Sequence, residues 1–134
     1  MNDKFLKVLF GIAAIYDGVL GIAFLFWTER IFSAFQVTPP NHLGYVQFPA
    51  LLLLMFGWLF LKIARNPKAN WHLIPYGIWL KASYCGMVFW YEVTTGVPDM
   101  WIPWAWADLA FLLLFVWAFV QLRGNERQLS VEGV

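Results

Sequence analysis

Three ionisable residues stand inside otherwise apolar runs and are the strongest candidates for chemistry. Asp17, Lys81 and Asp108 are each the only charge in an apolar run of about 20 residues. An ionised side chain at the centre of a bilayer costs about 2.5–3.5 kcal/mol on insertion scales. Such residues therefore tend to pair with one another or to mark a pathway for protons, ions or ligands. We take these three residues as candidate ligand-binding or proton-binding residues.

The depths of these residues along their helices predict that they meet. At a rise of about 1.5 Å per residue, Asp17 lies about 15 Å beyond Lys7, and Lys81 about 13 Å beyond His72, measured from the same boundary. Asp108 lies roughly 6–8 Å further out, a gap that the long lysine side chain can cover. We expect Lys81 to lie between the two acids, with one carboxyl holding a proton because two carboxyls face one ammonium. The alternative, that the cluster only fixes helix rotation and register, stays open.

Aromatic residues close to these charges extend the candidate site. Trp104 precedes Asp108 by one helical turn in the stretch WIPWAWADLAF, so both side chains are expected to point inward. Tyr16 and Tyr84 are the further candidates for lining the site. An aromatic belt at the two membrane surfaces accounts for most of the other tryptophans and tyrosines.

Other kinds of chemistry have little support in the sequence. His42 and His72 are predicted at opposite ends of the molecule, about 30 Å apart, so they cannot share a metal or a haem, and we predict no metal site. Cys85 is the single cysteine and is expected to be a small packing residue. The chain has no glycine-rich nucleotide motif, and no serine has a histidine at a matching depth.

The composition indicates the kind of molecule that must position these residues. The chain has 134 residues, of which 61% are hydrophobic and only 13% are charged, whereas soluble domains carry about 25% charge. A chain this short cannot bury so much apolar surface in water. We predict an all-α fold, an integral membrane four-helix bundle of up-down-up-down topology, as one domain. The predicted spans are 5–27, 43–64, 72–93 and 101–122, and a polar, mobile cytoplasmic tail follows at 123–134.

Smaller features refine this prediction. Ile31, Phe32 and Phe35 recur at helical spacing after the first span, which predicts a short amphipathic helix whose phenylalanines anchor it at the membrane surface. Pro49 is expected at or near the first turn of the second span, where its missing N–H is tolerated. Small residues that allow a neighbouring helix to approach closely recur along the first span. They are Gly11, Ala14, Gly18 and Gly21.

The distribution of basic residues predicts the orientation. Four crossings place seven of them on one side of the membrane: Lys4, Lys7, Lys62, Arg65, Lys68, Arg123 and Arg127. Basic residues favour the cytoplasmic side. We therefore predict a multi-pass protein of the bacterial inner (plasma) membrane with both termini in the cytoplasm. Because topology accounts for these charges, no nucleic-acid partner is expected.

The overall pattern resembles the DoxX-like family of small four-helix bacterial membrane proteins. The resemblance covers roughly residues 11–124 and rests on the segments FLFWTERIFSAFQVTPP, PALLLLMFGWLFLKIARNPKAN, GIWLKASYCG and WADLAFLLLFVWAFVQLRG. Named members of that family include membrane subunits of thiosulfate:quinone oxidoreductase. The resemblance thus implies a membrane subunit or accessory protein that contacts quinone, and it transfers no catalytic residue to this chain.

These observations leave three hypotheses for function. The leading one is a non-catalytic membrane protein, either an accessory subunit or a binder of a small hydrophobic ligand such as a quinone or a lipid. The second is a small membrane enzyme, an isomerase or an oxidoreductase subunit, that acts on an isoprenoid, sterol-like or quinone substrate, with Asp108 or Asp17 moving a proton. The third is a proton or ion conduit formed by an oligomer. No cofactor is evident beyond a quinone or lipid, and the expected partners are the lipid bilayer and either another membrane protein or a second copy of the chain.

Overall fold

The computed structural model describes residues 3–133, which form helices and contain no strand. The all-α prediction is confirmed, and most helix ends lie within two residues of the predicted spans. The helices are α1 (Asp3–Phe26), α2 (Thr28–Ala34), α3 (Gly44–Arg65), α4 (Ile74–Val93) and α5 (Ile102–Glu132), with single 3-10 turns η1 (Trp71–Leu73) and η2 (Asp99–Trp101) before the last two.

Three of the helical segments in the described chain are long and apolar enough to cross a membrane. They are α1, α3 and the segment Asp99–Glu132 that contains α5. The predicted third span does form a helix, α4, but α4 is not among these three. The reason is its composition, because Lys81 and several tyrosines, tryptophans and glycines replace the aliphatic residues that fill the other long helices.

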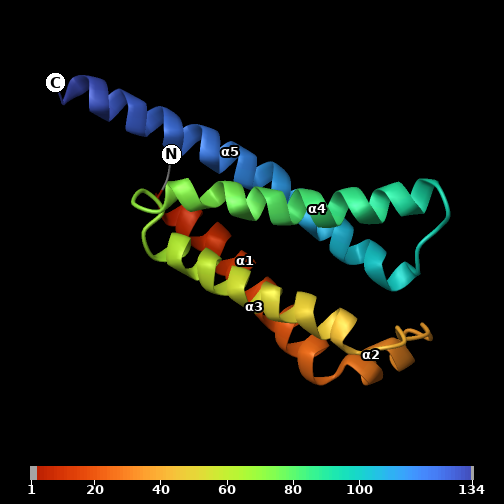
Figure 1. Ribbon diagram of the computed structural model, residues 1–134. Coiled ribbons are helices and arrows are strands. Elements are labelled where there is room, and N and C mark those ends of the chain that lie inside the picture. The colour runs from red at the N-terminus through yellow and green to blue at the C-terminus, as the bar shows by residue number, and fades with distance from the viewer. Residues whose placement is uncertain (1–2, 134) are drawn as a thin grey trace.

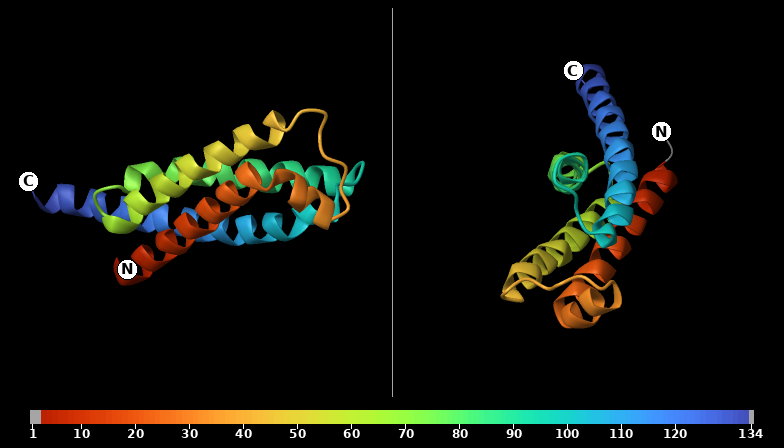
Figure 2. Two further views of the ribbon diagram at one scale, coloured as in Figure 1. Left: turned by 90° about the horizontal axis from the view of Figure 1, so that it is seen from below. Right: turned by 90° about the vertical axis from the view of Figure 1, so that its right-hand side faces the viewer.

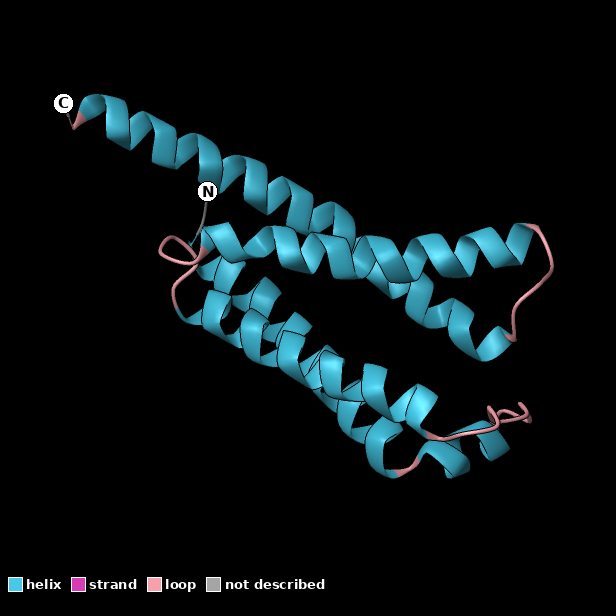
Figure 3. Ribbon diagram, viewed as in Figure 1, coloured by secondary structure: helices cyan, strands magenta, loops and turns pink. Residues whose placement is uncertain are grey.

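The long helices pack as two antiparallel hairpins. α1 lies along α3, and α4 lies along α5, whereas α3 and α4 touch only sparingly (Figure 1). The two hairpins converge at the end that carries the 66–70 loop and diverge toward the end that carries α2 and the 94–98 loop (Figure 3). A regular four-helix bundle therefore stays a prediction, and the observed unit is a pair of hairpins.

Both ends of the described chain lie at the same end of the molecule, where the hairpins converge (Figure 2). α1 begins there and α5 extends beyond it. This placement agrees with an even number of long antiparallel helices. Which side of a membrane this end faces stays a prediction.

The main core lies where the hairpins converge. Phe10 stacks on Phe115 with ring centroids 4.8 Å apart, and Phe60 lies 5.2 Å from Phe115. All three side chains are fully buried and come from α1, α3 and α5. A second, smaller cluster joins the hairpins beneath α2. It contains Phe24, Phe32, Ala50 and Met100.

The short helix α2 occurs where the sequence predicts it, but one of its phenylalanines does not point outward. Phe32 is 4% exposed and packs edge-on against Trp101, with centroids 5.8 Å apart. Phe35 is 53% exposed. Anchoring of Phe32 at a membrane surface was therefore a wrong interpretation, because α2 follows directly on α1 and its apolar face covers the second core cluster.

Small residues let α1 and α3 approach closely. A Cβ added to Gly21 would lie 2.8 Å from the carbonyl oxygen of Ala50, and one added to Gly57 would lie 3.2 Å from that of Ala14 and 3.3 Å from the nitrogen of Gly18. The predicted close approach is thus confirmed at Gly21 and along the backbone of Ala14 and Gly18, which lies against Gly57. A Cβ added to Gly11 or to Gly18 itself would meet nothing within 4 Å.

The position of Pro49 differs from the prediction. α3 begins at Gly44, so Pro49 lies inside the helix, past its first turn. Because proline has no backbone N–H, the carbonyl of Tyr45 one turn earlier lacks its usual helical donor. This part of α3 is a weak point of the helix, and it borders the cavity described below.

The polar tail at 123–134 is also different from the prediction. α5 continues through Glu132, so the described part of the tail is helical. Arg, Glu, Gln and Leu in this segment all favour helix, and the single Gly124 is tolerated. Its side chains beyond Leu122 are exposed, as its polar composition predicts.

Candidate ligand-binding site

The three charges that stand alone in apolar runs of the sequence meet in the structure. The Lys81 Nζ lies 2.9 Å from Asp17 Oδ1 and 2.9 Å from Asp108 Oδ1. The side chains come from α4, α1 and α5, and the residues are 0%, 1% and 7% exposed. The predicted contact is therefore confirmed. The role of these residues in binding a ligand or a proton stays a prediction.

Lys81 contacts both carboxylates and three aromatic rings. An ammonium has three donors, and two of them go to the carboxylates. The Nζ also lies 5.1 Å from the ring centres of Tyr16 and Phe111 and 5.7 Å from that of Phe60, distances at which a cation is attracted to an aromatic face. Lys81 consequently holds the two acids in place, and it is fully buried behind them.

The close approach of α4 makes this arrangement possible. Gly77 lies one turn before Lys81, and a Cβ added there would come within 2.5 Å of the Phe60 ring and 3.3 Å of the Phe115 ring. The glycine therefore lets α4 sit directly on the aromatic core, and Lys81 enters the interior at the next turn.

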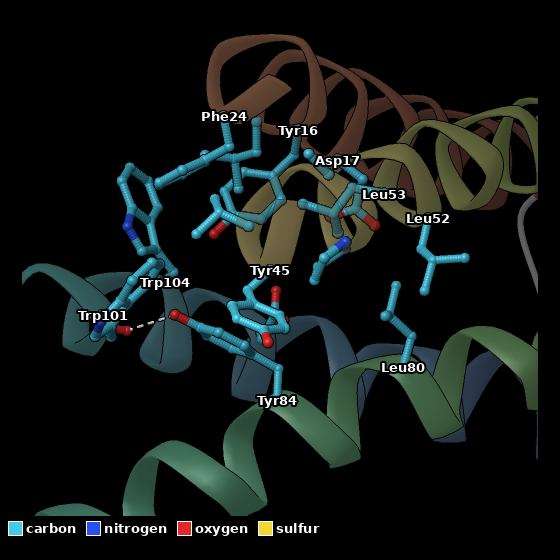
Figure 4. A pocket seen from close by; sticks show the side chains of 15 residues that line it. Tyr16, Asp17, Phe24, Tyr45, Leu52, Leu53, Leu80, Tyr84, Trp101 and Trp104 are labelled. Atoms are coloured by element: carbon cyan, nitrogen blue, oxygen red, sulfur yellow. Dashed lines mark hydrogen bonds between the residues drawn. The ribbon is translucent and has the colours of Figure 1, made fainter. Parts of the chain in front are cut away.

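A cavity of about 370 Å³ adjoins the charge cluster between the two hairpins (Figure 4). Of the six residues singled out in the sequence, five line it: Asp17, Asp108, Tyr16, Tyr84 and Trp104. Lys81 lies behind them and does not line it. The other lining residues are largely apolar or aromatic: Leu20 and Phe24 of α1, Tyr45, Val46, Pro49, Ala50, Leu52 and Leu53 of α3, Leu80 of α4, and Trp101 of η2.

Three polar atoms of the lining residues are buried without a hydrogen-bond partner among the described residues. They are Tyr16 Oη, Asp17 Oδ2 and Trp104 Nε1. Tyr84 differs, because its hydroxyl donates to the carbonyl of Trp101 at 2.9 Å (Figure 4). A buried polar group without a partner costs about 1–3 kcal/mol. Three such atoms on residues of one cavity favour a site in which a bound molecule supplies the missing hydrogen bonds.

The residues of α3 that line the cavity were not predicted from the sequence. They include Val46, Ala50 and Leu53, which carry no charge and look like any other apolar span. The one signal was Pro49, a helix-weakening residue in an apolar run. Trp101 was not singled out from the sequence, yet it lines the cavity, with its ring 5.7 Å from that of Phe24.

The remaining sequence candidates lie outside the cavity lining. Cys85 is buried and its thiol donates to the carbonyl of Ala105 at 3.3 Å, which confirms it as a packing residue. His42 precedes α3 and His72 lies in η1 beyond the far end of α3, so the two histidines are separated by the length of that helix.

No family model matches the chain, and no curated protein or solved structure matches it either. The resemblance to the DoxX-like family stays a prediction.

Proposed function

We propose that this chain is an integral membrane protein that binds a small, largely apolar ligand in the cavity between its two hairpins. The observation that carries the proposal is the cavity itself. It combines an apolar wall with the unpaired polar atoms of Tyr16, Asp17 and Trp104. Ligand sites are typically apolar cavities with a few polar groups that orient the ligand.

The surface supports a place in a membrane. Besides the three long apolar segments, the outward faces of the helices carry large hydrophobic side chains such as Ile15 and Val19 of α1 and Leu113 of α5, which are 69%, 60% and 63% exposed. Extended apolar surface of this kind is costly in water. In this proposal α4 is the fourth span, because the two carboxylates neutralise Lys81. We propose the bacterial inner membrane as the location. Because the basic residues gather at one end of the molecule, we propose that both termini lie in the cytoplasm.

The size of the cavity limits the ligand. About 370 Å³ is near the lower end of the range for small-molecule sites, roughly 300–1,000 Å³. It accommodates one ring or a short branched segment of a quinone-like or lipid-like molecule, and a longer tail has to leave the cavity. We favour this binding role over that of an accessory subunit because the cavity supports binding directly.

Filling the cavity tests the proposal. Leu53 lines the cavity from α3, and Leu53→Trp places a large ring in it. The neighbouring Leu51 is 50% exposed and does not line the cavity, so Leu51→Trp is the matched control. We expect native mass spectrometry of the protein purified in mild detergent to show a bound apolar compound that Leu53→Trp loses and Leu51→Trp keeps. A compound retained equally by both variants, or no compound and no uptake of an added apolar probe, would contradict the proposal.

A further inference from the structure

The unpaired polar atoms of the cavity come from residues that lie close to one another. The rings of Tyr16 and Trp104 have centroids 6.3 Å apart, although they belong to different hairpins. Asp17 follows Tyr16 in α1, and both contact Lys81, one through a 2.9 Å ion pair and the other through its ring at 5.1 Å. The Tyr16 and Trp104 rings therefore lie near each other across the two hairpins, and Asp17 lies next to Tyr16 in the sequence and beside the charge cluster.

The donors and acceptors of these groups describe the head group that would satisfy them. Trp104 Nε1 can only donate a hydrogen bond, so it needs an acceptor. An ionised Asp17 can only accept, so its Oδ2 needs a donor. The Tyr16 hydroxyl can do either. A head group that satisfies these atoms must therefore both donate and accept a hydrogen bond.

A hydroxyl group is the simplest head that meets this requirement. A ketone, quinone or ether oxygen accepts from Trp104 but gives nothing to the Asp17 carboxylate. An ammonium donates to Asp17 but leaves the Trp104 N–H unpaired. We take Asp17 as ionised, because its other oxygen pairs with the Lys81 ammonium at 2.9 Å. We propose that the natural ligand is an apolar alcohol or phenol whose hydroxyl lies between Tyr16, Asp17 and Trp104. This inference rests on the binding function proposed above.

The path of the apolar body follows from the exposed part of the cavity wall. Tyr45 is 69% exposed and Leu52 is 36% exposed, yet both line the cavity, so they mark its mouth on the side of α3. Pro49 lies between them in the sequence. A tail that leaves through this mouth would enter the lipid, with the hydroxyl held inside near the charges.

Three probes with the same body and different heads test the inference. 4-Octylphenol can donate and accept, its methyl ether 4-octylanisole can only accept, and octylbenzene can do neither. Octylammonium serves as the cationic probe. Calorimetric titration of the full chain in detergent measures each affinity. Because a hydrogen bond to a charged acceptor is lost, we expect the anisole to bind about tenfold or more weakly than the phenol.

Tyr16→Phe removes one hydroxyl and keeps the ring, and Trp104→Phe removes the indole N–H and leaves a smaller aromatic ring. Tyr16→Phe and Trp104→Phe are expected to weaken the binding of octylphenol about threefold to tenfold and to leave octylbenzene unchanged. Tyr76 and Trp79 of α4 are 60% and 74% exposed and do not line the cavity, so Tyr76→Phe and Trp79→Phe are the matched controls and keep the wild-type ratio. Comparing variants with one probe also cancels its partition into detergent.

The outcomes separate this inference from the function on which it rests. If none of the probes binds, the proposed binding function fails. If phenol, anisole and octylbenzene bind alike, or if octylammonium binds best, the cavity does bind apolar molecules but the hydroxyl inference is overturned. Tighter binding of the phenol that persists in both cavity variants would overturn it as well, since the preference would then arise elsewhere.

Discussion

The charge cluster makes an unusual prediction about stability, because its two carboxylates share one ammonium. Lys81→Met removes the ammonium that pairs with both Asp17 and Asp108 and leaves two buried carboxylates without it. Removing one partner of a buried ion pair costs about 3–5 kcal/mol, because the other charge is left uncompensated. We expect a loss of at least this size for Lys81→Met.

The charge balance predicts that the carboxylate variants behave differently. Asp17→Asn or Asp108→Asn leaves one carboxylate for Lys81, so the cluster becomes neutral and the amide oxygen can still accept from the ammonium. Each should therefore cost less than Lys81→Met, at about 1–3 kcal/mol. Asp17→Asn should cost more than Asp108→Asn, since the Asp17 side chain is 1% exposed and that of Asp108 is 10% exposed.

The decisive variant combines all three changes. Asp17→Asn with Lys81→Met and Asp108→Asn contains no buried charge at this position, and we expect it to recover most of the stability lost in Lys81→Met. Unfolding by SDS titrated into mild-detergent micelles measures the free energies, with the fluorescence of the nine tryptophans as the signal. If Lys81→Met loses under about 1 kcal/mol, or if the triple variant is as unstable as Lys81→Met, the reasoning about a buried, mutually neutralised cluster is refuted.

Three more predictions concern two hydroxyl groups, the packing of α1 on α3, and the orientation in the membrane. Tyr16→Phe removes a buried hydroxyl that has no partner, so it should leave the free energy of unfolding unchanged or raise it. Tyr84→Phe removes a hydroxyl that donates to Trp101, so it should lower the free energy of unfolding by about 0.5–1.5 kcal/mol. The same SDS titration measures both. Gly21→Ala should destabilise the chain, because the new methyl would lie 2.8 Å from a carbonyl oxygen of α3, and Gly11→Ala, which meets nothing within 4 Å, should not; equal effects would contradict the observed packing of α1 on α3. In inside-out membrane vesicles, a thiol introduced by Ser130→Cys should react with a membrane-impermeant reagent, and protection there with reaction in right-side-out vesicles would contradict the proposed orientation.

The sequence allowed the centre of the site to be predicted because charge and helix geometry constrain it strongly. A lone lysine in an apolar helix requires a buried partner, and a fixed rise per residue places Asp17 at its depth. Trp104 followed from its position one turn before Asp108. These arguments need no knowledge of how the helices are arranged.

The wall of the cavity could not be predicted in the same way. Leu53 and Ala50 look like any lipid-facing or core residue, because a hydrophobic side chain gives no information about its neighbours in an apolar solvent. The inward rotation of Phe32 depends on how α2 turns back after α1, and that turn has no clear sequence signal. The helical continuation beyond Leu122 was missed because the polar composition was used to end the predicted span at residue 122, although the residues that follow favour helix.

The hypotheses of a structural and a functional charge cluster are compatible in this fold. The Lys81–Asp108 pair lies within the second hairpin, whereas the Lys81–Asp17 pair connects that hairpin to the first. The same Asp17 offers its second oxygen, unpaired, beside the cavity that the two hairpins enclose. A cluster that served packing alone would be expected to use that oxygen as well, because leaving it bare in an apolar interior is costly. The unpaired atoms are Asp17 Oδ2, Tyr16 Oη and Trp104 Nε1. They favour a site in which the ion pair holds the two hairpins together and a ligand completes the hydrogen bonds of these atoms.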